Sequence, residues 1–188
     1  RTRKHAHPLQ PTMNRLLANL RTAAASLLLT ALAAAQNFDG PYWTELPNPT
    51  AGISQFRTIG ETGLIQTPVG YHFYSGITRK WTQLATTGPT TFQIANKYAI
   101  VQSGTTFHAF SSRTGEVATL NANAGATLQF GSANASWACY VLDGNRVHGF
   151  TAFHGQWVTL NLSAAPSAVA LGPHTVVVAD GTTAYGLS

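Results

Sequence analysis

The amino-acid sequence predicts an all-β fold, a four-bladed β-propeller that is closed by pairing its N-terminal strand with the C-terminal blade. Three observations support this fold class. Two short sequence elements each occur four times, at steps of 36 to 40 residues. Short apolar runs alternate with tight glycine turns. Beyond residue 35, the apolar residues show none of the periodicity that would indicate a helix.

The first repeated element ends in leucine, and three of its four copies begin with tryptophan. Its copies are Trp43-Thr-Glu-Leu46, Trp81-Thr-Gln-Leu84, Val117-Ala-Thr-Leu120 and Trp157-Val-Thr-Leu160. The copies of the second element are Tyr71-His-Phe-Tyr74, Phe107-His-Ala-Phe110, Val147-His-Gly-Phe150 and Ala184-Tyr-Gly-Leu187. The two elements alternate along the chain, so each repeat is expected to contain one strand of each kind.

The connections between the apolar runs predict which strands pair. Asp143-Gly144 and Asp180-Gly181 favour the positive φ angles of two-residue hairpins. Gly115 and Gly155 mark a second tight turn, and Gly172-Pro173 marks a third. The connection after each leucine-ending element is longer. Three tight turns and one longer link predict a four-stranded antiparallel unit, the blade of a propeller.

The repeats also place the blades along the chain. We expect three complete blades over residues 53–84, 91–120 and 127–160, and three strands of a fourth blade over residues 168–188. The strand that the fourth blade lacks is predicted at Tyr42–Leu46. Pairing this strand with the last blade would satisfy two open sheet edges, which otherwise promote aggregation.

The repeat pattern resembles that of kelch-type propellers. In that family an apolar strand ends in a glycine turn, an aromatic residue follows, and a tryptophan stands seven residues later. The pairs that keep this step are Tyr74 and Trp81, Phe110 and Val117, and Phe150 and Trp157. Valine replaces tryptophan in one pair, Asp-Gly stands where the family has Gly-Gly, and kelch propellers usually have more than four blades. The resemblance covers about residues 42–188 and implies a propeller.

The N-terminal part predicts an exported protein. Residues 1–12 precede the only methionine and are treated as an upstream segment, Met13–Ala35 reads as a signal peptide, and residues 36–188 form the propeller domain. A basic start, a short apolar core at Ala23–Leu32 and three alanines at its end are typical of such signals. An uncleaved membrane anchor and a buried helix stay open as alternatives. The expected location is extracellular or periplasmic, with no membrane attachment after cleavage.

Charge excludes one class of partner. The net charge of +5 comes from the N-terminal part, because residues 36–188 contain six basic and six acidic side chains. A nucleic-acid partner is not expected, since such proteins need a clustered excess of cations. The single cysteine, Cys139, lies in an apolar run and is expected to be a buried thiol without a disulfide partner.

No catalytic group stands out from the sequence, and no cofactor or metal is expected. His72, His108 and His148 occupy one position of the repeat. A shared metal site is an alternative, but equivalent positions of different blades should lie too far apart for one ion. We therefore expect these histidines to pack between neighbouring blades.

Candidate ligand-binding residues gather at one end of the predicted blades. Turns between first and second strands and between third and fourth strands share this end, where Lys97 and His174 are also expected. Asp143 and Asp180 fall at the other end. Trp137 follows a polar loop and should be more exposed than the other tryptophans. The candidate ligand-binding residues are Arg79, Lys80, Arg113, His154 and Trp137.

These observations predict a secreted, non-catalytic binding module whose loops recognise a glycan or a protein. Two alternatives remain at the level of sequence. One is a polysaccharide lyase or hydrolase with a site near the propeller axis, although the absence of a recognisable catalytic set weighs against an enzyme. The other is a structural cell-surface protein that assembles through its blades.

Overall fold

The structure is a computed structural model that describes residues 43–46, 52–134 and 136–188. The chain divides into two units, residues 1–45 and 46–188, and all the strands lie in the second. The predicted signal peptide lies outside the described residues. Within the part that the structure describes, no helix is long and apolar enough to cross a membrane.

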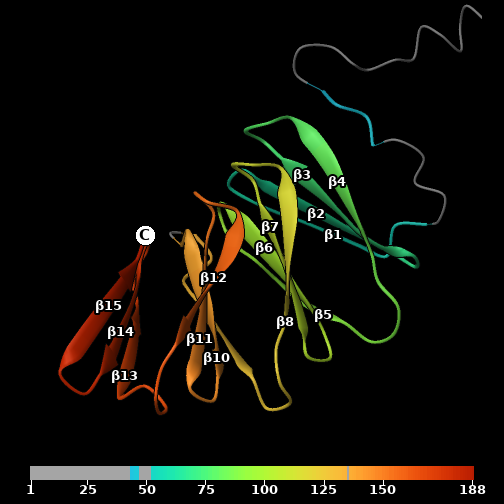
Figure 1. Cartoon of the computed structure of the whole chain (residues 1–188). Helices are drawn as coiled ribbons and strands as arrows, with labels where there is room; N and C mark the ends of the chain where they lie inside the picture. Colours follow the sequence, from blue (N-terminus) through green and yellow to red (C-terminus); the bar gives the residue numbers. More distant parts are fainter. Residues whose placement is uncertain (1–42, 47–51, 135) are drawn as a thin grey trace, which may run out of the picture. The chain divides into compact units, whose positions relative to one another are not determined.

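The described residues form fifteen β-strands in four antiparallel sheets, which follow one another along the chain (Figure 1). The first two sheets contain β1 (Gln55–Ile59), β2 (Thr62–Thr67), β3 (Gly70–Ser75), β4 (Lys80–Ala85), β5 (Thr91–Ile94), β6 (Tyr98–Ser103), β7 (Thr106–Ser111) and β8 (Glu116–Asn121). The last two contain β9 (Thr127–Phe130), β10 (Ala138–Asp143), β11 (Arg146–Thr151), β12 (Gln156–Asn161), β13 (Ala168–Leu171), β14 (Val176–Asp180) and β15 (Thr183–Leu187).

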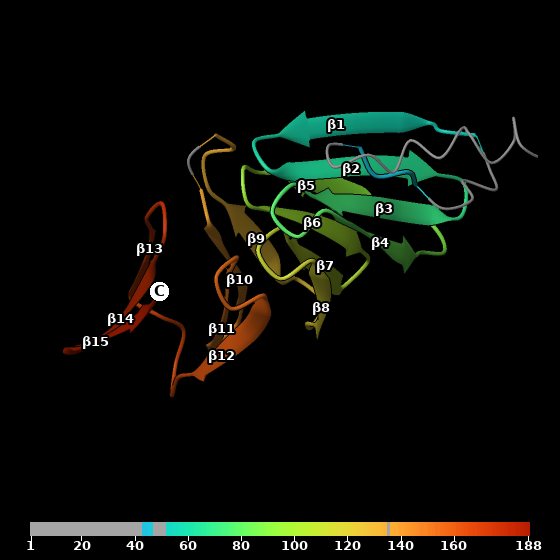
Figure 2. The same cartoon turned by 90° about the horizontal axis from the view of Figure 1, so that it is seen from above.

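Each sheet has the topology of a propeller blade. The strand orders are β1-β2-β3-β4, β5-β6-β7-β8, β9-β10-β11-β12 and β13-β14-β15, so sequence neighbours always pair (Figure 2). We call these sheets blades 1 to 4. The predicted blade limits are confirmed, and both repeated elements form the expected strands except for the copy at residues 43–46. The second element is the third strand of every blade, and the leucine-ending element is the fourth strand of blades 1 to 3.

Glycines in the hairpin turns adopt the conformation that the turns need. Gly104, Gly144 and Gly181 have φ angles of 59°, 62° and 59° in the hairpins between the second and third strands. These values lie in the left-handed region, which costs a residue with a Cβ more than it costs glycine. The turns fix equivalent registers, because Asp143 pairs with Arg146 and Asp180 pairs with Thr183.

The core consists of three apolar layers, one between each pair of consecutive blades. Phe73 of blade 1 stacks on Phe110 of blade 2, with ring centroids 4.9 Å apart. Tyr98 of blade 2 contacts Phe150 of blade 3 in the next layer, at 5.9 Å. The third layer, between blades 3 and 4, is purely aliphatic among its buried members. Because alternate residues of a strand face opposite ways, each inner blade contributes to two layers.

One expectation about the N-terminal strand is not met. Residues 43–46 form no strand, and the Trp43 side chain is 75% exposed rather than packed in a blade. Blade 4 therefore has three strands among the described residues. The local sequence resembles the fourth strands of other blades, but a strand needs a hydrogen-bonded neighbour to form. Closure of a ring by this segment stays a prediction.

Candidate functional site

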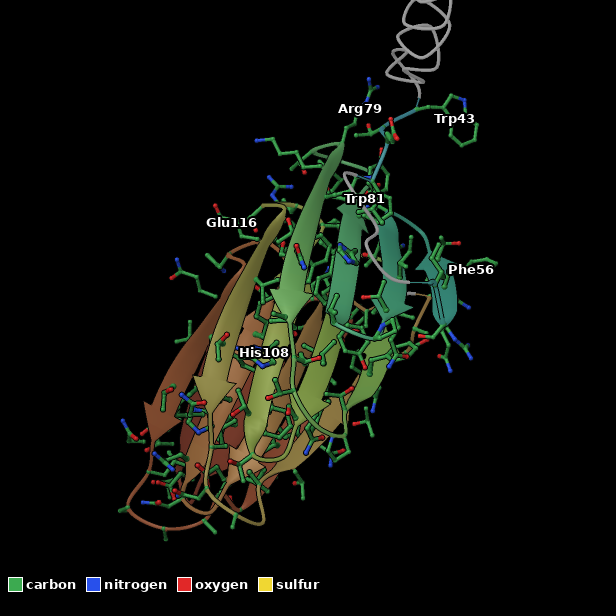
Figure 3. All side chains as sticks on the ribbon, turned by 90° about the vertical axis from the view of Figure 1, so that its right-hand side faces the viewer. Trp43, Phe56, Arg79, Trp81, His108 and Glu116 are labelled. Carbon is green, nitrogen blue, oxygen red and sulfur yellow. The ribbon has the colours of Figure 1, made fainter. Side chains whose placement is uncertain are left out.

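The turns at one end of the blades gather the basic and aromatic side chains. Turns between first and second strands and turns between third and fourth strands share this end, because neighbouring strands run antiparallel. Figure 3 shows Arg79, in one such turn, and Glu116, at the start of β8 just after another, at the same end of the sheets. We call this the loop end. The predicted placement is confirmed, since Asp143 and Asp180 are the last residues of β10 and β14, next to the turns at the opposite end.

A row of equivalent residues runs across the loop end. Lys97 and Trp137 directly precede the second strand of their blades, and one residue separates His174 from the second strand of blade 4. The Lys97 ammonium lies over the Trp137 ring, 4.8 Å from its centroid, and His174 contacts the same ring at 5.2 Å. Glu61, the equivalent residue of blade 1, forms an ion pair with Lys97. The equivalent residues of the four blades therefore contact one another in a continuous line.

A second pair of equivalent residues packs beside this row. Arg113 and Phe153 occupy the same position in the turns between third and fourth strands of blades 2 and 3. The Arg113 guanidinium lies 5.0 Å from the centroid of the Phe153 ring. Phe153 in turn stacks on Trp137, with centroids 4.5 Å apart and planes inclined by 17°. Lys97, Arg113, Trp137, Phe153 and His174 form what we call the loop-end cluster.

Backbone hydrogen bonds hold Trp137 in place. Its N–H donates to the carbonyl of Pro173 in blade 4 at 2.7 Å, and its carbonyl accepts from the N–H of Ala152 at 2.8 Å. The buried hydroxyl of Tyr98 donates to the carbonyl of Ala138 at 2.8 Å. Burial raises the pKa of Tyr98, so this hydroxyl keeps its proton and remains a donor. The position of the indole is therefore set by three blades together.

The turn that carries Arg113 depends on the buried hydroxyl of Ser111. This hydroxyl donates to the carbonyl of Ala152 in blade 3 at 2.7 Å. It also accepts from the N–H groups of Arg113 and Thr114, at 3.1 and 3.2 Å. Ser75 makes the equivalent bond from blade 1 to the carbonyl of Ser112. One small side chain thus shapes the turn and joins it to the next blade.

The electrostatics of the loop-end cluster favour anions. Its ionisable members are two cations and one histidine, and the neighbouring acid, Glu61, is already paired with Lys97. Arg113 is exposed, and among the described residues no carboxylate forms an ion pair with it. A guanidinium held against an aromatic face loses little side-chain freedom when it binds a carboxylate. The cluster can bind an anionic group flanked by apolar surface.

The structure brings two of the predicted ligand-binding residues, Arg113 and Trp137, into one cluster. Arg79 and Lys80 lie at the loop end of blade 1, at the turn before β4. His154 lies next to Phe153 in sequence, but its Nδ1 is 3.0 Å from the hydroxyl of Thr151. Lys97 and His174 stand at the expected end, and their contacts with Trp137 were not foreseen.

Phe153 and Ser111 were missed by the sequence reasoning. Both could have been found by comparing the repeats beyond their two strong elements. Phe153 is a large apolar residue in a turn, three residues after the aromatic Phe150. Ser111 follows Phe110 directly, as Ser75 and Thr151 follow the equivalent aromatic residues. The motifs drew attention to strands, whereas the contacts between blades depend on the residues just after them.

His108 and His148 lie on the strand faces that pack against the preceding blade, as expected, whereas His72 lies with Tyr74 on the face of β3 that is turned away from blade 2. His108 shares a strand face with Phe110, and its Nδ1 forms a hydrogen bond with the Thr119 hydroxyl at 2.9 Å (Figure 3). His148 makes the same contact with Thr159 at 2.9 Å. Burial lowers the pKa of His72, His108 and His148. Among the described residues, no three metal-ligating side chains cluster together.

His148 also contacts an acidic side chain in blade 3. Its Nε2 lies 3.4 Å from Oδ2 of Asp143, which also accepts from the Arg146 guanidinium and the N–H of Asn123. Burial alone would raise the pKa of Asp143, but these donors together hold it below the usual value. The arrangement fits a neutral ring that donates from Nε2 and accepts at Nδ1.

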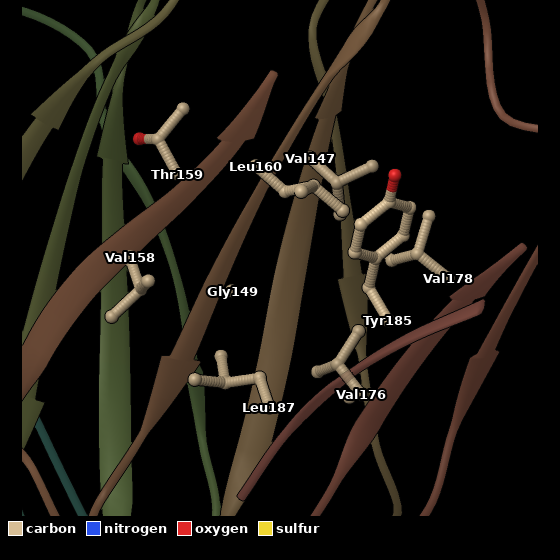
Figure 4. A pocket seen from close by; sticks show the side chains of 10 residues that line it. Val147, Gly149, Val158, Thr159, Leu160, Val176, Val178, Tyr185 and Leu187 are labelled. Atoms are coloured by element: carbon tan, nitrogen blue, oxygen red, sulfur yellow. The ribbon is translucent and has the colours of Figure 1, made fainter. Parts of the chain in front are cut away.

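The chain of contacts from Asp143 through His148 to Thr159 has the composition of a catalytic triad, but its location does not suit catalysis. The nearest groove lies between blades 3 and 4, where Val158 and Leu160 line it. Thr159 also borders this groove, but its hydroxyl contacts the His148 ring, on the face of the sheet that is turned toward blade 2 (Figure 4). A nucleophile has to face the substrate and a set of oxyanion donors. We assign these residues a structural role.

A second hollow, of about 740 Å³, lies along the first strands of blades 1 and 2. Its walls are largely amide, hydroxyl and aliphatic groups, and Arg57 is the one charged side chain that lines it. General acid–base catalysis of glycan cleavage needs a pair of titratable groups. Cys139 offers no nucleophile either, because it is fully buried and burial raises the pKa of its thiol.

Comparison with known proteins adds fold neighbours of low similarity. No family model matches the chain, and no curated protein matches it. Among solved structures, a eukaryotic initiation factor is 16% identical with a TM-score of 0.39, covering 81% of this chain and 44% of that one. The WD40 domain of Neurospora crassa Pan2 is 17% identical with a TM-score of 0.33, covering 73% and 49%. The WD40 domain of fission yeast SCAP is 10% identical with a TM-score of 0.34, covering 73% and 41%.

The chain spans less than half the length of each of these structures. The consecutive antiparallel sheets, their equivalent turns and the layers between them define the chain as a β-propeller repeat protein. Membership of the kelch family stays a prediction.

Proposed function

We propose that this chain is a non-catalytic binding module that recognises an acidic segment of a partner protein at its loop end. The observation that carries the proposal is the contact between Arg113 and Phe153. It presents an exposed guanidinium, pre-positioned on an aromatic ring, at the junction of two blades. Aromatic residues and arginine are the side chains that contribute most to protein interfaces.

The packing of Trp137 favours a peptide over a sugar. A sugar ring stacks on an open aromatic face, but Phe153 and the Lys97 ammonium both lie against the indole. Phe153 is 40% exposed and Arg113 is exposed, so the accessible surface of the cluster combines an apolar ring with a cation. Carboxylates flanked by aliphatic side chains fit this surface best.

Isothermal titration of the full chain with a blocked peptide of alternating glutamate and leucine tests the proposal. We expect binding that weakens as salt rises, because charge pairing at an exposed site is screened. Arg113→Ala should weaken binding about tenfold. The combined change of Arg79, Lys80 and Arg113 to alanine should weaken it further. A sulfated oligosaccharide of equal charge should bind more weakly than the peptide.

The matched control is Arg57→Ala, which removes an exposed arginine from β1 rather than from the loop end. This variant should bind the peptide as the unmodified chain does. Absence of peptide binding, or an equal loss in Arg57→Ala and Arg113→Ala, would contradict the proposed site. Stronger binding of the oligosaccharide would contradict the protein partner.

We further propose that the module acts outside the cytoplasm. The support is the sequence of Met13–Ala35, with a basic start, an apolar core and a run of alanines. Expression from Met13 in a secreting host should yield a mature protein whose first residue is Gln36, as determined by mass spectrometry of its N-terminus. Retention of the segment on the isolated protein would contradict export by this route.

A further inference from the structure

The outer edge of blade 4 differs from the corresponding region of the other blades. In blades 1 to 3 a fourth strand pairs with the outer edge of the third strand. Most residues of these third strands, β3, β7 and β11, are buried. No described strand covers β15, and none of its five residues is buried. An uncovered strand presents free backbone donors and acceptors along its edge.

An apolar groove of about 210 Å³ adjoins this edge, between blades 3 and 4 (Figure 4). Its lining is largely aliphatic. Val158 of β12 is 49% exposed and Tyr185 of β15 is 39% exposed, which leaves a large apolar surface in contact with solvent. The side chains that line it include Val147, Val158, Leu160, Val176, Tyr185 and Leu187.

The other blades indicate what such a groove accommodates. Trp157 of β12 stands opposite Phe150 of β11 and packs into the layer between blades 2 and 3, which also contains Ala118. Val117 of β8 stands opposite Phe110 and packs into the layer between blades 1 and 2. In both cases the first residue of the leucine-ending element fills the space between two blades.

The same register can be continued onto β15. Leu187 is equivalent to Phe110 and Phe150, so a residue opposite Leu187 on an added strand would enter the groove. Val158 of β12 is the equivalent of Ala118 of β8, which lines the layer between blades 2 and 3. The residue three positions later on the added strand would stand opposite Ala184. At the equivalent position, the fourth strands of blades 2 and 3 have leucine.

We propose that the β15 edge and this groove form a second binding site, which takes an extended peptide with the pattern Trp-x-x-Leu as the fourth strand of blade 4. Main-chain hydrogen bonds to β15 would hold the peptide, and the tryptophan would fill the groove. This site lies on the strands and is independent of the loop-end cluster. The chain supplies a probe sequence, because residues 43–46 carry the same pattern as Trp157-Val-Thr-Leu160.

The test uses a blocked synthetic peptide with the sequence of residues 40–48. Binding is measured by calorimetry on the full chain carrying Trp43→Ala, so that its own segment lacks the tryptophan. We expect saturable binding, and a peptide with alanine in place of the tryptophan should bind about tenfold to a hundredfold more weakly. Weaker binding by the unmodified chain than by Trp43→Ala also supports the proposal, since the chain's own segment then competes for the site.

Two further variants of the Trp43→Ala chain locate the site. Val158→Lys places a charge in the groove, whereas Val177→Lys changes a residue of similar exposure, 45%, on the other face of blade 4. Only Val158→Lys should reduce binding tenfold or more, and thermal unfolding of both variants confirms that they fold. The proposal is overturned if the peptide does not bind, or if both variants weaken binding equally.

Discussion

At the scale of single residues, buried side chains couple the stability of the fold to pH. His148 lies 3.4 Å from Asp143 and 2.9 Å from Thr159, and it is almost completely buried. Its pKa is lowered by burial, and the pKa values of His72 and His108 are lowered for the same reason. The unfolded chain therefore binds protons more readily than the folded chain below the ordinary histidine pKa.

We expect the free energy of unfolding to decrease as the pH falls below about 6.5, since there the unfolded state binds more protons. A second decrease should begin near pH 4, where Asp143 becomes protonated in the unfolded chain but remains ionised in the folded one. Urea unfolding at a series of pH values measures both effects. His148→Gln should reduce the slope between pH 6.5 and 5. An unchanged slope would show that this histidine is not the cause.

Glycines at the loop end carry a second residue-scale constraint. Gly155 has a φ of 66°, and a Cβ there would lie 2.7 Å from the Thr114 hydroxyl of the neighbouring blade. Gly155→Ala should reduce the free energy of unfolding by about 2–3 kcal/mol, through backbone strain and the clash. Gly104 has a φ of 59° with open space around it. Gly104→Ala should therefore reduce the free energy of unfolding by only about 1 kcal/mol. An equal reduction in both variants would show that the clash with Thr114 contributes nothing.

At the scale of elements, the serine hydroxyl at the end of the third strand links blade 1 to blade 2 and blade 2 to blade 3. Ser111→Ala removes the bond to Ala152 and leaves two turn N–H groups without their acceptor. The expected loss of stability is about 1–3 kcal/mol in denaturant unfolding. Ser103→Ala, at the opposite end of the same blade, is the control and should have a smaller effect. A larger loss in the control would contradict the proposed link.

The sequence was sufficient to predict the strands, because their signals are local. Alternating apolar residues and Asp-Gly turns identified β10, β11, β14 and β15 and their pairing. Residues 43–46 were predicted to be a strand but form none in the structure, because a Trp-x-x-Leu pattern indicates compatibility with a sheet and not the presence of a partner strand. The loop-end cluster was only partly foreseen, because stacking between Trp137 and Phe153 depends on how two turns of one blade meet.

At the scale of the whole domain, the blades should differ in stability. Blade 2 is covered on both faces and contributes to two core layers, whereas blade 4 contributes to one and has the uncovered strand β15. Stability in such repeat arrays depends on contacts between neighbouring units. Amide hydrogen exchange should be slowest in β6 and β7 and fastest in β13 to β15. Uniform protection across the four blades would contradict this expectation.

The central claim is that the loop end, and not another face of the domain, recognises acidic partners. Nuclear magnetic resonance of the ¹⁵N-labelled protein, titrated with the glutamate–leucine peptide, tests it residue by residue. The account predicts chemical-shift changes concentrated in the turns at residues 95–97, 112–115, 152–155 and 172–175, with the indole N–H of Trp137 among them. Changes confined to the turns at residues 144–145 and 181–182, or no changes at all, would contradict it.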